Sequence, residues 1–129
     1  MKNLTREIGK LNNKHCIEEV ERVQAELNEL RNRNILFKEQ LSDALSRDVS
    51  PDFVEKAEWY QQCFLETDQV IDILRHDLNM LLNKLKLDNP TADKDIQCSK
   101  LKTDVKKLAR SITEISRSFH TFLEQDPAN

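Results

Sequence analysis

Three cysteines have the widest chemical repertoire in this chain, because a thiolate can bind a metal or exchange with a disulfide. Cys16, Cys63 and Cys98 are widely spaced and lie outside any paired-cysteine motif. Counting outward from two expected turns places Cys16 and Cys98 in one layer of a helical bundle, with His15 adjacent. Zinc needs about four ligands in tetrahedral geometry, so Glu19 would have to supply the fourth.

Each cysteine also lies on or beside an apolar row of the sequence, where a free cysteine packs as a small hydrophobic side chain. Three interpretations of Cys16 and Cys98 are therefore open: buried core thiols, a redox pair, or part of a metal site. The pattern favours core packing. We predict no metal site and no cofactor.

The sequence gives little support to any other kind of catalytic site. Arg75-His76-Asp77 has the residue types of a catalytic group, but successive helical residues point about 100° apart and cannot form a triad among themselves. The single glycine excludes a glycine-rich phosphate loop. Helical di-iron sites use Glu-x-x-His pairs, and neither His76 nor His120 follows a glutamate at that spacing. We predict that the protein is not an enzyme.

The composition suits thin, solvent-bathed helices. Hydrophobic residues make up 38% of the 129 residues and charged residues 33%, with a net charge of -3. This charge gives no global case for nucleic-acid binding. The sequence shows no signal-peptide core and no membrane-spanning segment. Together with the odd number of cysteines, this predicts a cytoplasmic protein.

A helix over residues 51–87 is the central expectation. Apolar residues recur from Phe53 to Leu85 at alternating steps of four and three, with neither Gly nor Pro between them. The row comprises Phe53, Ala57, Tyr60, Phe64, Thr67, Ile71, Leu74, Leu78, Leu81 and Leu85. Such a seven-residue repeat predicts an amphipathic helix that packs on partner helices. Ser50 as N-cap and Pro51 at the first helical position mark its start.

Similar repeats predict a first helix over about 15–46 and a third over about 90–124, followed by a frayed tail at 126–129. The connecting turns are short, so neighbouring helices should be antiparallel. The predicted fold is all-α: a long antiparallel three-helix bundle over 15–125, with up-down-up topology, coiled-coil-like packing, and the first helix longest.

A second apolar row runs along the helix at 51–87. Trp59, Ile73, Met80 and Leu87 follow one another at spacings of seven or fourteen. With the main row they widen the apolar face to over half of the helix circumference. A helix buried on two sides is usually the middle one of three, so we expect helices of the same chain to cover this row.

The expected turns also predict which residues share a layer. Phe37, Tyr60 and Phe119 should form an aromatic core layer near the first turn. Asn34 should lie opposite Phe64. A lone asparagine in an apolar seam usually fixes helix register at some cost in stability, and a partner contact is the alternative.

The segment 1–14 reads as a basic amphipathic arm that continues into the first helix. Lys2, Arg6, Lys10 and Lys14 are spaced by four and form one basic ridge. Such a ridge can bind nucleic acid or an anionic membrane surface. Four charges give only a weak electrostatic footprint, so a solvated ridge is the favoured interpretation.

Ile35, Leu36 and Leu65 lie off the main apolar rows, at similar heights above the first turn. If exposed together, they form an apolar patch suited to a partner helix or a second copy of the chain. The sequence thus favours a non-enzymatic helical interaction protein, a scaffold or adaptor that acts through apolar helix faces, with a homodimer as one form. The alternatives are binding of nucleic acid or an anionic surface through the basic ridge, and, less favoured, a metal or thiol redox protein.

Overall fold

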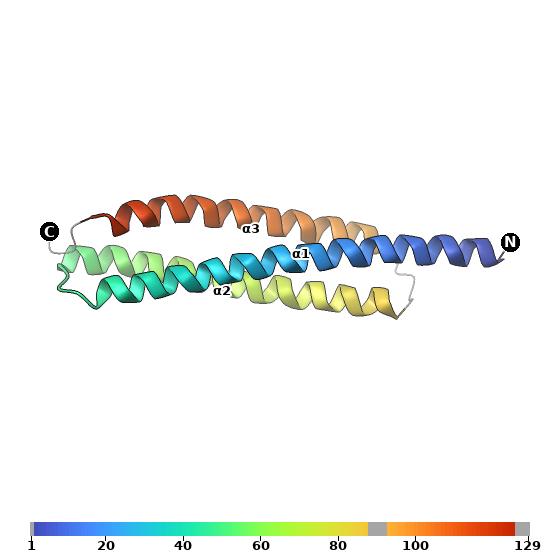
Figure 1. Ribbon diagram of the computed structural model, residues 1–129, viewed down its shortest axis with the longest axis horizontal. Coiled ribbons are helices and arrows are strands. Elements are labelled where there is room, and N and C mark those ends of the chain that lie inside the picture. Colours follow the sequence, from blue (N-terminus) through green and yellow to red (C-terminus); the bar gives the residue numbers. More distant parts are fainter. Residues whose placement is uncertain (1, 88–92, 126–129) are drawn as a thin grey trace. The chain divides into compact units, whose positions relative to one another are not determined.

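Three α-helices make up most of the described chain. The computed structural model describes the backbone of residues 2–87 and 93–125, and the side chains from residue 13 onward within those ranges. The helices are α1 (Lys2–Leu45), α2 (Pro51–Lys86) and α3 (Lys94–Leu123), as Figure 1 shows. These two ranges contain no strand. The predicted all-α fold with three packed helices is confirmed, whereas the up-down-up course stays a prediction.

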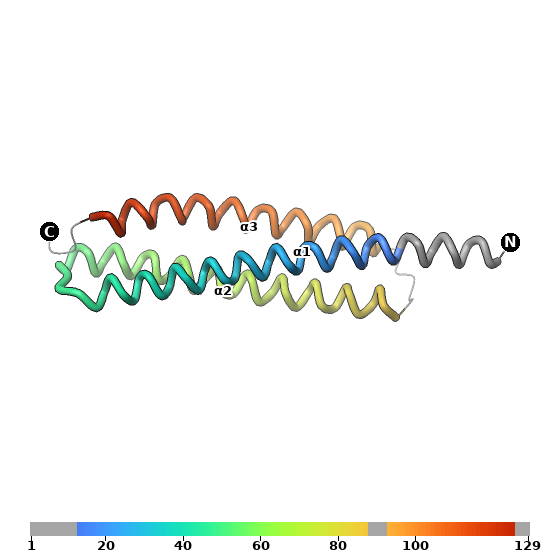
Figure 2. Tube along the Cα trace, viewed as in Figure 1, coloured from blue at the N-terminus to red at the C-terminus, as the bar shows by residue number. Residues whose placement is uncertain are grey.

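Parts of all three helices combine into two compact units. The first unit comprises Met1–Asn28 and Asp72–Lys107, and the second comprises Glu29–Ile71 and Leu108–Asn129. The colours of Figure 2 follow the sequence, so the pieces of each unit can be identified there. Each unit draws its core from α1, α2 and α3.

The predicted main row of α2 forms core in both units. All ten of its residues, from Phe53 to Leu85, are buried, including the polar Thr67. The Thr67 hydroxyl donates a hydrogen bond of 2.9 Å to the carbonyl oxygen of Cys63 one turn earlier. This bond explains how a polar residue is accommodated in an apolar row, because a buried hydroxyl must have a partner.

The second apolar row of α2 was predicted to be covered, and this prediction is wrong. Exposed fractions are 58% for Trp59, 61% for Ile73, 47% for Met80 and 72% for Leu87. The helical geometry gives the reason. At about 100° per residue, Ile73 points roughly 160° away from the buried Ile71. Neighbours packed on the main row cannot reach a side chain that points so far from it.

The expectation that α2 is the middle helix fails with it, because α1 also contacts α3 directly. In the first unit, Cys16 on α1 contacts Asp95 on α3, with a sulfur-oxygen distance of 3.4 Å. In the second unit, the rings of Phe37 on α1 and Phe119 on α3 have centroids 5.8 Å apart. In each unit, α1 and α3 therefore contact each other in addition to their contacts with α2.

The start of α2 agrees with the sequence. The backbone N–H of Phe53 donates to the Ser50 side-chain oxygen over 3.1 Å, and the N–H of Val54 donates to the Ser50 carbonyl oxygen over 3.1 Å. Ser50 is thus the N-cap: its side chain satisfies the Phe53 N–H, which has no partner within the helix, and its carbonyl oxygen accepts the first bond of the helix.

Replacing Ser50 with alanine should lower the free energy of unfolding by about 1 kcal/mol, the usual cost of losing an N-cap side chain. Ser50→Asp is the matched control, since aspartate caps as well as serine and places its charge at the positive end of the helix dipole. Urea unfolding monitored by circular dichroism measures both variants. Equal stability of Ser50→Ala and the native chain would contradict this role.

The third helix begins later than predicted. We expected it at about residue 90, but α3 begins at Lys94. The N–H of Gln97 donates to the Asp93 carbonyl oxygen over 2.9 Å, which makes Asp93 the N-cap, a position where aspartate is favoured. Residues 90–92, which the sequence assigned to this helix, lie outside the described residues, as does the tail at 126–129.

Candidate functional site

The three residues of the predicted patch are all exposed. Ile35 and Leu36 lie on α1 and Leu65 lies on α2, within the second unit. Their predicted common height is supported by a neighbouring contact. The Asn34 side-chain nitrogen donates to the Phe64 carbonyl oxygen over 3.0 Å, and these two residues directly precede Ile35 and Leu65.

Asn34 belongs to a polar network beneath this surface. Its side-chain nitrogen donates to one Asp68 carboxylate oxygen over 2.6 Å, and the Lys38 ammonium donates to the other over 2.6 Å. Asn34 itself is 1% exposed. The predicted placement of Asn34 opposite Phe64 is confirmed. A buried asparagine with two acceptors on α2 favours one alignment of the two helices, because another alignment would leave its amide unpaired.

An aromatic cluster forms the core of the second unit, as the predicted layer required. Phe119 is fully buried, with ring centroids 5.8 Å from Phe37, 5.3 Å from Tyr60 and 5.0 Å from Phe64. The Tyr60 hydroxyl is paired with the Ser118 hydroxyl. The predicted trio is confirmed, and sequence counting missed that Phe64 and Phe122 also belong to the cluster. The cluster therefore serves packing.

The cysteine layer lies in the first unit, between α1 and α3. The Cys16 thiol donates to an Asp95 carboxylate oxygen over 3.4 Å, and the Cys98 thiol donates to a Glu19 carboxylate oxygen over 3.8 Å. The Lys102 ammonium lies 3.3 Å from the other Glu19 oxygen. Glu19 was expected here, but Asp95 was not. Asp95 lies three residues before Cys98 and therefore on the same face of the predicted helix, and this spacing is the signal that could have found it.

The surroundings of both thiols favour the protonated form, because they raise the pKa of each. Burial, and then the Asp95 carboxylate, raise the pKa of Cys16 from 9.0 to about 11. Burial, and then Glu19, raise the pKa of Cys98. Lys102 lowers the pKa of Glu19, mainly through its hydrogen bond. This arrangement disfavours the thiolates on which metal binding and disulfide exchange depend.

The arrangement of the cysteines points the same way. Cys16, Cys63 and Cys98 are free thiols. Among the side chains that the structure describes, no group of three or more His, Cys, Asp or Glu residues is placed to hold a metal ion. We therefore interpret Cys16 and Cys98 as core residues with local carboxylate partners.

Three of the four residues of the predicted basic ridge lie in the part of α1 whose side chains the structure does not describe. Lys2, Arg6 and Lys10 belong to α1, but only the fourth member, Lys14, has a described side chain, which is exposed. Binding of nucleic acid or an anionic surface through this ridge stays a prediction.

The uncovered face of α2 is the surface that sequence reasoning misjudged. In the first unit it carries Ile73, Met80 and Leu87, each separated by seven residues. The Leu87 N–H donates to the Asn83 carbonyl oxygen over 3.1 Å, so Leu87 keeps the helical spacing although α2 ends one residue earlier. The three side chains therefore line one face.

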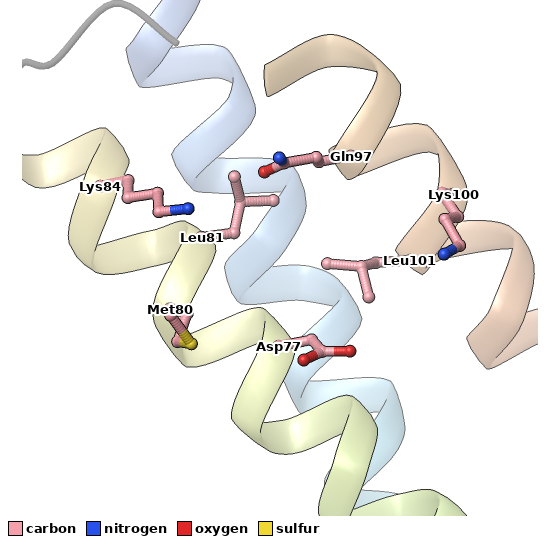
Figure 3. Close-up of a pocket in the computed structure, with 7 residues that line it drawn as sticks. All are labelled: Asp77, Met80, Leu81, Lys84, Gln97, Lys100 and Leu101. Atoms are coloured by element: carbon pink, nitrogen blue, oxygen red, sulfur yellow. The ribbon is translucent and has the colours of Figure 1, made fainter. Parts of the chain in front are cut away.

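A groove of about 270 Å³ adjoins this face between α2 and α3. Leu81 and Leu101 point toward one another across it, while Met80 and Lys84 lie on its α2 side (Figure 3). The lining residues are Asp77, Met80, Leu81, Lys84, Gln97, Lys100 and Leu101. An apolar floor between charged edges suits a side chain from another helix better than a polar substrate.

The fold and these surfaces define the class of protein: a three-helix protein with apolar residues exposed on its helix faces. Comparison of this chain with family models, with curated proteins and with solved structures finds no match. Within the described residues, no helix combines the length and apolar character that crossing a membrane requires.

Proposed function

We propose that this protein is a non-enzymatic helical interaction protein, a scaffold or adaptor that binds other helices through its apolar faces. One observation carries the proposal: large apolar side chains that the chain's own helices leave exposed. They are Ile35, Leu36, Trp59, Leu65, Val70, Ile73, Met80, Leu87 and Ile96. Single exposed apolar residues are common on monomers, but a repeated row along one helix is typical of an interface.

The patch of Ile35, Leu36 and Leu65 is the partner-binding surface of this proposal. It combines residues of α1 and α2, and the Asn34 network fixes these helices in register directly below it. A rigid support favours binding because few side chains must be ordered when the partner arrives. A partner helix would bury its own apolar face on these side chains.

A cytoplasmic location is part of the proposal. The three free thiols support it, because reducing compartments keep cysteines unpaired. In such a compartment the protein would link partners by helix packing, without a cofactor and without chemistry of its own.

The triple variant Ile35→Glu, Leu36→Glu, Leu65→Glu should lose its partner proteins by at least tenfold in affinity capture from native cells. Three buried carboxylates in an apolar interface would be strongly unfavourable, whereas glutamate suits the exposed helix positions of the free protein. Quantitative mass spectrometry of the captured proteins provides the measurement.

The matched control is Ser111→Glu, Thr113→Glu, Thr121→Glu, which adds three negative charges at exposed positions of α3, the helix of the same unit that carries no patch residue. It should capture the same proteins as the native chain. Equal capture by the patch variant and this control would refute the role of the patch.

A further inference from the structure

We infer that the exposed α2 face of the first unit binds the same face of a second copy, in antiparallel orientation. This inference rests on the proposed function, because it names the partner of one apolar helix face. It concerns the α2 seam, which we define as Ile73, Asp77, Met80, Lys84 and Leu87. This surface differs from the patch on the second unit.

The spacing of the α2 seam is that of a coiled-coil interface. Its members follow one another at steps of four, three, four and three, the same alternation as in the buried main row. A 3.5-residue repeat keeps one face of a helix against a partner helix. All five side chains are exposed, so none of the described parts of α1 and α3 covers this face.

The charges of the seam choose the orientation. Asp77 and Lys84 form no ion pair with any side chain described in residues 13–87 and 93–125. In a parallel pair, Asp77 would meet Asp77 and Lys84 would meet Lys84, and both contacts repel. In an antiparallel pair with its two-fold axis near Asn79, each Asp77 lies within about one helical turn of the other copy's Lys84. The seam is therefore self-complementary in charge only when the copies run in opposite directions.

The groove between α2 and α3 provides shape complementarity beside this complementarity of charge. At about 270 Å³ it is smaller than the roughly 300–1,000 Å³ of most small-molecule sites. Met80 stands at its edge, next to an apolar floor of Leu81 and Leu101 (Figure 3). Across the two-fold axis, an apolar seam residue of the second copy can enter the groove as a knob enters a hole.

Sedimentation equilibrium of the purified chain at low salt tests the inference. The native chain should approach twice the monomer mass of 15.1 kDa as its concentration rises. Ile73→Glu with Met80→Glu should weaken association at least a hundredfold while helicity by circular dichroism stays unchanged. A native chain that remains monomeric at all concentrations would overturn the inference.

Charge reversal tests the orientation. Asp77→Lys alone and Lys84→Asp alone should each weaken association at least tenfold, and the double variant should regain most of it, because the swap restores opposite charges across the interface. A parallel pair would respond differently, since like charges face one another before and after each reversal. Single variants that associate as tightly as the native chain would therefore refute the antiparallel arrangement.

The patch variant of the previous section separates the two proposals. Ile35→Glu, Leu36→Glu, Leu65→Glu should still dimerise like the native chain. If it becomes monomeric while the seam variants remain dimeric, the α2 seam is not the dimer interface, although binding through an apolar helix face stands. If the native chain is monomeric and the patch variant still loses its partner proteins, only the self-association is refuted.

Discussion

Replacing Phe119 with alanine should lower the free energy of unfolding by about 3–5 kcal/mol, the range measured when buried aromatic side chains are truncated. The ring is 0% exposed. It touches residues of all three helices, with centroid distances of 5.0 Å to Phe64 and 5.8 Å to Phe37. Its removal leaves a cavity that no single neighbour can fill. Two-state domains are only about 5–15 kcal/mol stable, so the loss would take much of the total.

Urea unfolding provides the measurement, and it is followed both by the aromatic signal of the second unit and by the total helicity. Phe119→Leu is the informative companion, because it keeps much of the apolar volume and should lose less than the alanine variant. Thr121→Ala, at an exposed position of the same helix, should change stability by less than about 0.5 kcal/mol. If Phe119→Ala and Thr121→Ala were equally stable, the aromatic cluster would not be the core of this unit.

Cys16 should react with iodoacetamide at pH 8 at least a hundredfold more slowly than an unfolded cysteine. Its pKa of about 11, against an ordinary 9.0, lowers the thiolate fraction at this pH by about a hundredfold. Burial slows access further. Mass spectrometry of the labelled peptides resolves the cysteines from one another. Asp95→Asn should speed the labelling of Cys16, because it removes the negative charge that opposes the thiolate. Labelling of native Cys16 at the unfolded rate would show that the thiol is neither buried nor paired.

The Cys16 thiol should also make the free energy of unfolding depend on pH in the alkaline range. The native state holds the Cys16 proton more tightly than the unfolded chain, because the native pKa of about 11 lies above the ordinary 9.0. This contribution to stability is therefore fully present below pH 9, and it is lost as the pH rises to about 11.

Comparison with Cys16→Ala isolates this effect from the titration of lysine and tyrosine side chains. The difference in melting temperature between the native chain and the variant should shrink from pH 8 to pH 11. A constant difference over that range would mean that the thiol has the same pKa in both states.

The sequence by itself determined the features that depend on local geometry. The alternating steps of four and three identified the buried row of α2, because a helix places such residues on one face whatever its neighbours are. Ser50 and Pro51 specified the start of α2 for a similarly local reason. Counting outward from the two expected turns placed Asn34 opposite Phe64 and brought Phe37, Tyr60 and Phe119 together.

The tertiary structure alone decided which apolar residues are covered. Trp59, Ile73 and Met80 are as apolar as core residues, so residue type alone does not separate them from the core. Burial of a side chain requires a neighbouring helix in its direction, and the packing directions of α1 and α3 arise only when the three helices assemble. For the same reason, the contact between Cys16 and the Asp95 carboxylate depends on how α1 packs against α3.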